Sequence, residues 1–147
     1  MNIAGIDYDL NNKALCIYIS GCKAPHCPGC HNSSLWDFNK GENWCKYEDK
    51  MKEYISTDMV KYVWILGGEP LDNNQQELEA LIVFVSMVCN NKVMLWTRYE
   101  LNQVPDNILQ YLDYIKTGEY QCDSESYRES VLGITLASKN QKVIKLR

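Results

Sequence analysis

The chain has 147 residues and a formal net charge of -4, and this length fits one domain, residues 1–147, but falls short of the roughly 250 residues of a complete eightfold βα barrel. Its Lys and Arg residues are scattered rather than gathered into a patch, which excludes the basic footprint of a nucleic-acid-binding surface. No apolar stretch approaches the roughly 20 residues of a membrane span, and the N-terminus lacks a signal-peptide pattern, so we expect a cytoplasmic protein with no membrane partner.

The first predicted element is a strand over residues 14–20, which are mostly apolar, β-branched or aromatic and end at Gly21. This strand leads into a loop that holds three cysteines. Beyond the loop, the sequence predicts a short helix over residues 32–38 and a longer helix over residues 47–56. The cysteine loop therefore follows the C-terminal end of a strand.

The second predicted strand covers residues 62–66 and is stopped by two glycines and Pro70. A helix follows, capped by Asp72 or Asn73 and running to about Cys89, with apolar residues at helical spacing. The remaining predicted elements are a strand over residues 92–97, a short helix over 105–112, a strand over 114–116 and a possible fifth strand over 131–136. Repeated βα units predict a mostly parallel sheet with outer helices, and sites on such sheets gather at the C-terminal ends of the strands.

Three of the seven cysteines, Cys22, Cys27 and Cys30, lie within nine positions. This crowding suits metal ligation in a reducing compartment better than a disulfide framework. Three thiolates can cap three irons of a cubane iron-sulfur cluster and leave the fourth iron open to a ligand. A zinc knuckle completed by His26 or His31 fits the same spacing, so the triplet alone leaves iron and zinc as alternatives.

The other four cysteines lie far from this triplet and from one another. Cys16 and Cys89 fall in apolar runs, and we expect them to be small buried hydrophobes. Cys45 and Cys122 have polar neighbours in the sequence, so we expect exposed thiols that are prone to oxidation.

A turn of Gly67, Gly68, Glu69 and Pro70 follows the second predicted strand. Two glycines remove Cβ atoms where a ligand must approach the backbone, and the Glu69 carboxylate can accept hydrogen bonds from an amino group. By itself the turn also fits a plain connection between a strand and a helix. Because it comes one βα unit after the cysteine loop, it indicates a site in which an open iron chelates an α-amino carboxylate and the turn holds the amino end.

Together these motifs resemble the activating proteins of anaerobic ribonucleoside-triphosphate reductase, a family of radical S-adenosylmethionine enzymes. The resemblance covers residues 14–147, nearly the whole chain. It rests on Ser20-Gly21-Cys22, Cys27-Pro28-Gly29-Cys30-His31-Asn32, Trp36, Gly67-Gly68-Glu69-Pro70-Leu71, Trp96-Thr97, Tyr114-Ile115-Lys116-Thr117-Gly118 and Ser138-Lys139-Asn140-Gln141. The ordered combination is far more specific than the triplet or the turn alone.

The resemblance implies a truncated TIM-type βα barrel of the radical S-adenosylmethionine type, with a mostly parallel sheet and outer helices. It implies that Cys22, Cys27 and Cys30 are the catalytic and metal-binding residues, which hold a [4Fe-4S] cluster with S-adenosyl-L-methionine on the fourth iron. The implied cofactor-binding residues are Gly29 and His31 near the nucleoside, Gly67, Gly68 and Glu69 at the methionine end, and Thr97 at the edge of the site.

The implied activity is the formation of a glycyl radical on a partner enzyme. An electron from the reduced cluster breaks the bond between the sulfonium and the 5′ carbon, and the deoxyadenosyl radical takes a hydrogen atom from a glycine Cα. The expected partners are an anaerobic ribonucleoside-triphosphate reductase and a reduced flavodoxin- or ferredoxin-type electron donor. A chain too short to wrap its own site also needs a protein substrate to shield a carbon radical from solvent.

Three features need weighing against the family's pattern. Four residues separate Cys22 from Cys27 where the family has three; such an insertion costs little entropy, so it leaves the cluster feasible but alters the contacts to the cofactor. Gly29 is usual for the activating proteins, but other radical S-adenosylmethionine enzymes commonly have an aromatic residue there, so a stacking contact to adenine comes from elsewhere or is absent. Arg98 stands where the family often has glycine, and it either binds the cofactor's carboxylate or is solvated.

Two further functions fit the same residues. One is a radical enzyme that acts on a small metabolite or on another glycyl-radical enzyme, such as pyruvate formate-lyase. The other is a non-catalytic zinc-binding interaction domain. The lack of an additional ferredoxin-like cysteine set favours a minimal activase, in which Trp36 serves either at the partner interface or as a core anchor for the loop.

Overall fold

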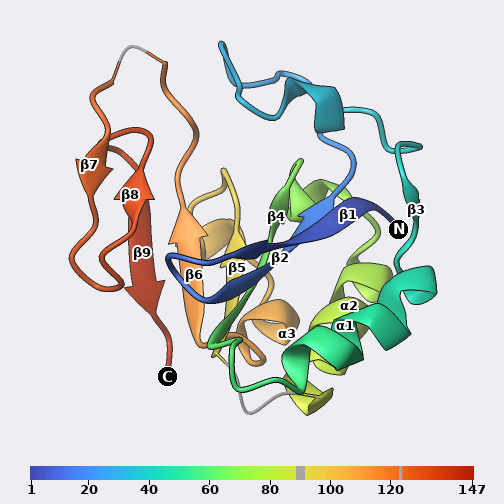
Figure 1. Cartoon of the computed structure of the whole chain (residues 1–147). Coiled ribbons are helices and arrows are strands. Elements are labelled where there is room, and N and C mark those ends of the chain that lie inside the picture. The colour runs from blue at the N-terminus through green and yellow to red at the C-terminus, as the bar shows by residue number, and fades with distance from the viewer. Residues whose placement is uncertain (89–91, 123) are drawn as a thin grey trace.

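The computed structural model describes residues 1–88, 92–122 and 124–147 of the chain. Its main element is a seven-stranded sheet with the strand order β3-β1-β2-β4-β5-β6-β9 (Figure 1). Its strands are β1 (Asn2–Asp9), β2 (Ala14–Ile19), β3 (Glu42–Asn43), β4 (Tyr62–Gly67), β5 (Lys92–Trp96), β6 (Tyr114–Thr117) and β9 (Lys142–Lys145). A separate two-stranded sheet is formed by β7 (Tyr127–Arg128) and β8 (Thr135–Leu136).

The helices are short, and the three α-helices lie together on one side of the main sheet (Figure 1). They are α1 (Glu48–Ile55), α2 (Gln75–Val88) and α3 (Asp106–Leu109). Short 3-10 helices complete the connections as η1 (Ser33–Leu35), η2 (Trp44–Tyr47), η3 (Pro70–Asp72) and η4 (Leu101–Gln103). In the described part of the chain, no helix combines the length and the apolar character needed to cross a bilayer.

The centre of the main sheet is parallel and its flanks are antiparallel. β2, β4, β5 and β6 run in the same direction. β1 pairs antiparallel with β2, β3 with β1, and β9 with β6. The sheet is therefore mixed, whereas the sequence predicted a mostly parallel one, because a tight turn between β1 and β2 leaves no room for the crossover that a parallel pair requires. The truncated barrel stays a prediction.

The parallel strands confirm those predicted over residues 14–20, 62–66, 92–97 and 114–116. The fifth strand, predicted over residues 131–136, is wrong in extent, because its last two residues form β8 and the sheet instead ends in β9. β1 had no sequence prediction, and its pairing with β2 is irregular, with a register shift between Ile3 and Gly5. β1 and β9 are antiparallel strands at the two flanks of the sheet, and their formation depends on the neighbour with which each one pairs, which the local sequence does not specify.

The predicted helices are present but differ in length. α1 and α2 lie within the helices predicted over residues 47–56 and 73–89. The helices predicted over residues 32–38 and 105–112 contract to η1 and α3. Cys89, the predicted end of the long helix and a predicted buried thiol, lies outside the described residues.

The cap of α2 differs from the sequence expectation. The side chain of Asn74 accepts a hydrogen bond from the Glu77 N–H at 3.1 Å, the pattern of an N-cap residue. Asp72 and Asn73, the expected caps, instead bond to the segment after β2, since Asp72 accepts from the Lys23 N–H and Asn73 donates to a backbone carbonyl there. The side chains of Asp72 and Asn73 therefore stabilise the segment after β2 and do not cap α2.

The helix-covered face of the sheet holds the main core. A cross-strand row of Ile17, Ile65, Leu95 and Ile115 runs over the parallel strands and is buried with the helices. The apolar stripe expected on α2 is fully buried in the same core and consists of Leu78, Leu81, Ile82 and Val85. This core fixes the relative positions of the strand ends, where the site residues begin.

The opposite face of the sheet is lined by larger side chains. A second cross-strand row contains Cys16, Trp64, Met94 and Tyr114, and Leu136 of β8 packs in the same cluster. Cys16 is buried in this cluster, which confirms the prediction of a small buried hydrophobe, and burial raises the pKa of its thiol to about 12. Toward the C-terminal strand ends, this face continues into the pocket described next.

Candidate functional site

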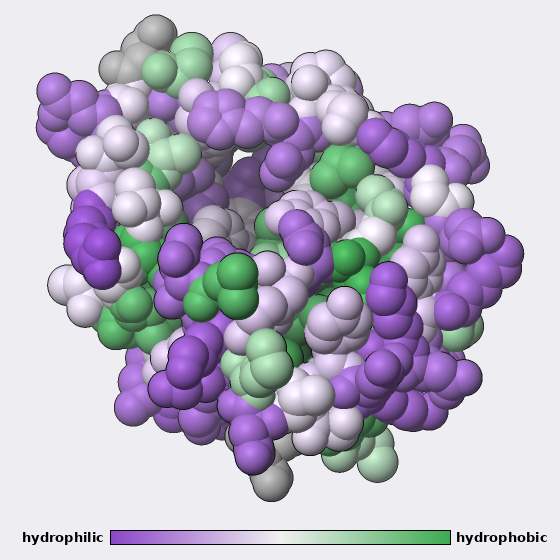
Figure 2. Space-filling model, viewed as in Figure 1, coloured by the Kyte–Doolittle hydropathy of each residue, from purple (hydrophilic) through white to green (hydrophobic). Residues whose placement is uncertain are grey.

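A pocket of about 250 Å3 lies at the C-terminal edge of the four parallel strands. Figure 2 shows the surface hollowed between the segment after β2 and the segment after β6. Parallel neighbours end on the same side, so these loops meet at one edge. The lining comprises Cys22, Cys27, Cys30, His31, Asn32, Trp36, Leu66, Gly67, Gly68, Glu69, Trp96, Thr97, Arg98, Lys116, Gly118, Tyr120, Thr135, Ala137 and Gln141.

All three cysteines of the triplet line this pocket with free thiols. Cys27 is buried, whereas Cys22 and Cys30 are partly exposed. The Cys22 N–H donates to Trp36 O at 3.1 Å, and the Cys30 N–H donates to Cys27 O at 3.2 Å. Burial raises the pKa of Cys22 to about 11 and also raises the pKa of Cys27, so both thiols are protonated at neutral pH unless a metal displaces the protons.

The three cysteines fit the ligand set of a cubane cluster. Three thiols in one cavity are the donor set of a cubane site with one open iron. Each nearby histidine has one ring nitrogen next to a partner, since His26 Nε2 lies 2.8 Å from Cys22 O and His31 Nε2 lies 3.0 Å from the Tyr120 hydroxyl. Across residues 1–88, 92–122 and 124–147, no three His, Cys, Asp or Glu side chains converge on a position for one ion.

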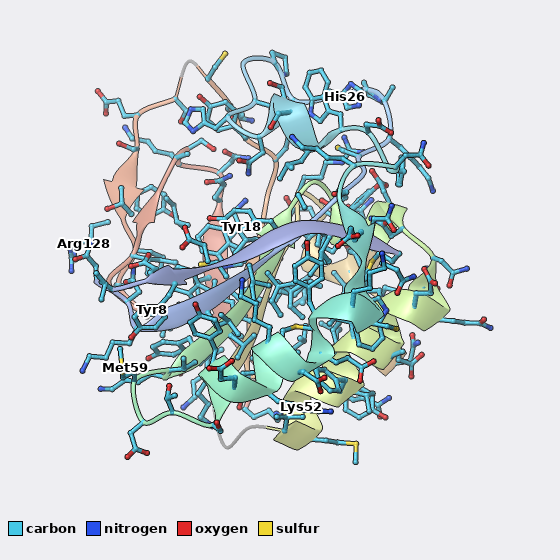
Figure 3. The ribbon with its side chains drawn as sticks, turned by 45° about the vertical axis from the view of Figure 1, so that its right-hand side comes forward. Tyr8, Tyr18, His26, Lys52, Met59 and Arg128 are labelled. Carbon is cyan, nitrogen blue, oxygen red and sulfur yellow. The ribbon has the colours of Figure 1, made fainter. Side chains whose placement is uncertain are left out.

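Trp36 packs against the cysteine loop. Its ring stacks on His26 with centroids 3.9 Å apart and an angle of 4° between the planes. Figure 3 labels His26 on this loop, at the end of the molecule away from Lys52 on α1. Trp36 is half-buried and contacts the loop through this stacking, and its position at a partner interface stays a prediction.

Arg98 binds the longer part of the loop, between the first two cysteines. Its guanidinium donates to Pro25 O at 2.6 Å and to Lys23 O at 3.0 Å. It also pairs with Asp72 at 3.1 Å, whose carboxylate accepts from the Lys23 N–H and from the Tyr99 hydroxyl, each at 2.6 Å. These contacts hold the guanidinium against the loop that contains the extra residue, so Arg98 is not simply solvated and stabilises that loop. Arg98 also lines the pocket, and its binding to a ligand's carboxylate stays a prediction.

The two glycines of the turn pack against the end of β2. A Cβ atom on Gly68 would lie 2.3 Å from Gly21 O, and one on Gly67 would lie 2.7 Å from Ile19 O. The Gly68 N–H donates to Ile19 O, and the next N–H donates to Gly21 O, each at 2.8 Å. The structure therefore adds the approach of a second stretch of backbone as a reason for these glycines. Both glycines also line the pocket, and the approach of a ligand to them stays a prediction.

Glu69 is buried, 2% exposed, and connects the turn to the end of β5. Its Oε1 accepts from the Thr97 hydroxyl at 2.7 Å and from the Leu71 N–H at 3.1 Å, and its Oε2 accepts from the Arg98 N–H at 2.7 Å. Burial raises the pKa of the Glu69 carboxyl, and these three hydrogen bonds oppose the rise. Within the described chain Oε2 accepts one hydrogen bond, so a lone pair remains for an amino group.

Lys116 also belongs to the pocket, although sequence reasoning did not single it out. It lies on β6, is 7% exposed, and its Nζ donates to Gly118 O at 2.8 Å. Burial lowers its pKa to about 8, while the nearby Glu69 and Cys27 favour the charged form. The available signal was a lysine within a predicted strand of the parallel sheet, since a lysine is rarely buried without a polar or charged partner.

The predicted site residues gather around this one pocket, apart from Gly29, which lies outside its lining. Their roles toward a cluster or a cofactor stay predictions. Chemically, the pocket offers three sulfur donors, one buried carboxylate and one buried ammonium group. Such a set can bind a metal cluster together with a small zwitterion.

Comparison with known proteins gives a consistent picture. A family model described as a 4Fe-4S single cluster domain matches residues 12–144. The chain is 31% identical over 104 residues to the anaerobic ribonucleoside-triphosphate reductase-activating protein of Salmonella typhimurium, covering 67% of each chain. The protein of the same name from Salmonella typhi is 30% identical over 139 residues, 89% of this chain and 87% of that one. No solved structure matches.

Replacing Arg98 with lysine tests the anchoring of the loop. Lysine keeps the charge but cannot reach three acceptors at once, so we expect Arg98→Lys to fold normally and to lose iron to a chelator about tenfold faster after reconstitution. The loss is followed by visible absorbance. The matched control is Arg128→Lys, an exposed position on β7 far from the cysteine loop in Figure 3. Equal rates for both variants would contradict the anchoring role.

Replacing Lys116 with methionine tests the cost of its buried charge. Below pH 8 the lysine is charged in both the folded and the unfolded chain, so the folded state bears the full desolvation penalty. Between pH 8 and 10.5 the lysine of the folded chain releases its proton while that of the unfolded chain keeps it. The cost of the buried charge to the free energy of folding therefore falls progressively over this pH range. We expect metal-free Lys116→Met to melt about 2–4 °C higher than wild type at pH 7. Calorimetry should show this difference shrinking toward pH 10; a difference independent of pH would refute the depressed pKa.

Proposed function

Because the chain belongs to the family of anaerobic ribonucleoside-triphosphate reductase-activating proteins, we propose that it is a radical S-adenosylmethionine activase that generates a glycyl radical on an anaerobic ribonucleotide reductase. Its fold is then a truncated βα barrel of the radical S-adenosylmethionine type. The observation that carries the proposal is the shared pocket, in which the three thiols and the Gly-Gly-Glu turn line one cavity. The names of the relatives supply the kind of protein substrate.

Cys22, Cys27 and Cys30 would hold the [4Fe-4S] cluster in this pocket. When bound, the cluster and S-adenosylmethionine supply the chemistry, in which one electron breaks the bond from sulfur to the 5′ carbon and the deoxyadenosyl radical removes a hydrogen atom from a glycine Cα of the partner. The chain's own residues bind the cofactor, orient it and limit the access of water.

The charges of the pocket suit the amino acid end of S-adenosylmethionine. Glu69 keeps a lone pair on Oε2 for the ammonium group, and Thr97 and the Arg98 backbone fix that carboxylate in place. Lys116 offers a buried ammonium group to the carboxylate, and its present partner is a neutral backbone carbonyl. A ligand that brings both charges would therefore satisfy two buried groups at once.

A protein substrate would complete the enclosure of the pocket. At about 250 Å3 the cavity is small against the roughly 300–1,000 Å3 of drug-sized ligand sites, and it opens at the surface in Figure 2. A carbon radical formed there would need shielding from solvent, which the docked reductase would provide. We propose a reduced flavodoxin or ferredoxin as the source of the electron.

The cluster is tested with cysteine variants. Anaerobically reconstituted wild type should be brown, carry about four irons per chain and cleave S-adenosylmethionine to deoxyadenosine when reduced. Cys27→Ala should lose the colour and the cleavage, because the two thiols that remain in the pocket cannot hold a cubane. Cys45→Ala, at an exposed thiol outside the pocket, should keep both. A colourless wild type with one tightly bound zinc would instead support the zinc-binding alternative.

The protein substrate is tested by electron paramagnetic resonance. Reduced, reconstituted protein mixed with S-adenosylmethionine and the anaerobic reductase from the same source should produce a glycyl radical doublet, and omission of any one component should remove it. Cleavage of S-adenosylmethionine without a doublet would reject this reductase as the substrate. A doublet on a different glycyl-radical enzyme, or hydrogen transfer to a small metabolite, would then identify the alternative.

A further inference from the structure

The segment after β6 packs onto the cysteine loop at Gly29. This glycine has a φ of +68°, and a Cβ atom placed on it would lie 3.0 Å from Cys122 Cβ and 3.9 Å from Tyr120 Cε1. The space that a side chain at position 29 would need is therefore filled from a distant part of the chain. Of the two neighbours, Tyr120 also lines the pocket.

Tyr120 contacts the cysteine loop on both sides of Gly29. Its hydroxyl lies 3.0 Å from His31 Nε2, and the two ring centroids are 4.7 Å apart at an angle of 53°. On the other side, the Tyr120 backbone forms a hydrogen bond with Cys27. Tyr120 is thus held in the pocket wall, with its backbone hydrogen-bonded to Cys27 and its ring against His31.

The residues next to Tyr120 are tied to the chain behind it. Asn140 donates to Glu119 O at 2.7 Å, and the Gln121 N–H donates to Ser138 Oγ at 3.3 Å. The backbone on both sides of the tyrosine is therefore anchored. An aromatic side chain with a fixed backbone and a ring partner loses little freedom when a ligand packs on it.

We propose that Tyr120 supplies the aromatic face against which the purine of bound S-adenosylmethionine packs, with His31 orienting the ring. The inference rests on the proposed function and names the missing contact to the nucleoside. A purine is a planar heteroaromatic group, and stacking of its π-face on a tyrosine ring in the pocket wall stabilises binding. The segment after β6 thereby contributes what Gly29, without a side chain, cannot contribute.

The test compares two ligands that share the amino acid end but differ in the purine. Calorimetric titration of reconstituted protein measures the affinity for S-adenosylmethionine and for L-methionine under anaerobic conditions. Tyr120→Ala should weaken S-adenosylmethionine binding by about tenfold or more and leave methionine binding unchanged. Tyr54→Ala, at a more exposed tyrosine on α1, is the matched control and should change neither affinity.

Iron content and circular dichroism are recorded for every variant. If Tyr120→Ala loses its iron, the comparison of Tyr120→Phe with Tyr120→Leu decides, since the ring should preserve S-adenosylmethionine affinity and leucine should not. Unchanged S-adenosylmethionine affinity in Tyr120→Ala, or an equal loss for both ligands, overturns the stacking role while the proposed function stands. If wild type binds no S-adenosylmethionine, the proposed function itself fails.

Discussion

The site depends on one close backbone contact, between the turn after β4 and the end of β2. The Gly68 N–H donates to Ile19 O and the Glu69 N–H donates to Gly21 O, both at 2.8 Å. The two strands continue their pairing past the sheet in this way, and a Cβ atom at position 68 would collide with Gly21 O. Since Cys22 follows at once, this contact sets the distance between the cysteine loop and the turn.

Buried polar groups extend this contact to β5. Glu69 receives hydrogen bonds from three places in the chain, and Arg98 beside it reaches back to the loop at Lys23 and Pro25. A buried carboxylate with missing partners would be costly, whereas a satisfied one makes the wall rigid. The pocket is therefore largely organised before any ligand binds, which is what precise placement of a cofactor requires.

The elements that the sequence predicted are those whose apolar residues form a strong local pattern. Continuous apolar runs predicted β2, β4, β5 and β6, and helical spacing predicted the buried stripe of α2 that begins at Leu78. The flanking strands β1 and β9 escaped prediction because their antiparallel pairing depends on the neighbouring strand and not on a local pattern. The sequence did not reveal that Gly68 admits a second stretch of backbone, since no local pattern distinguishes a glycine that admits a ligand from one that admits another strand.

By itself, the sequence determined the chemistry available to this protein: three clustered thiols, a Gly-Gly-Glu turn and an order of motifs that identifies the family. Only the tertiary structure decided which distant side chains complete the site. Arg98 and Pro25 are 73 residues apart, and Tyr120 and His31 are 89 apart. Such contacts form because the assembled sheet brings the C-terminal ends of its parallel strands together. The spacing of residues in the sequence does not predict which of these strand ends become neighbours.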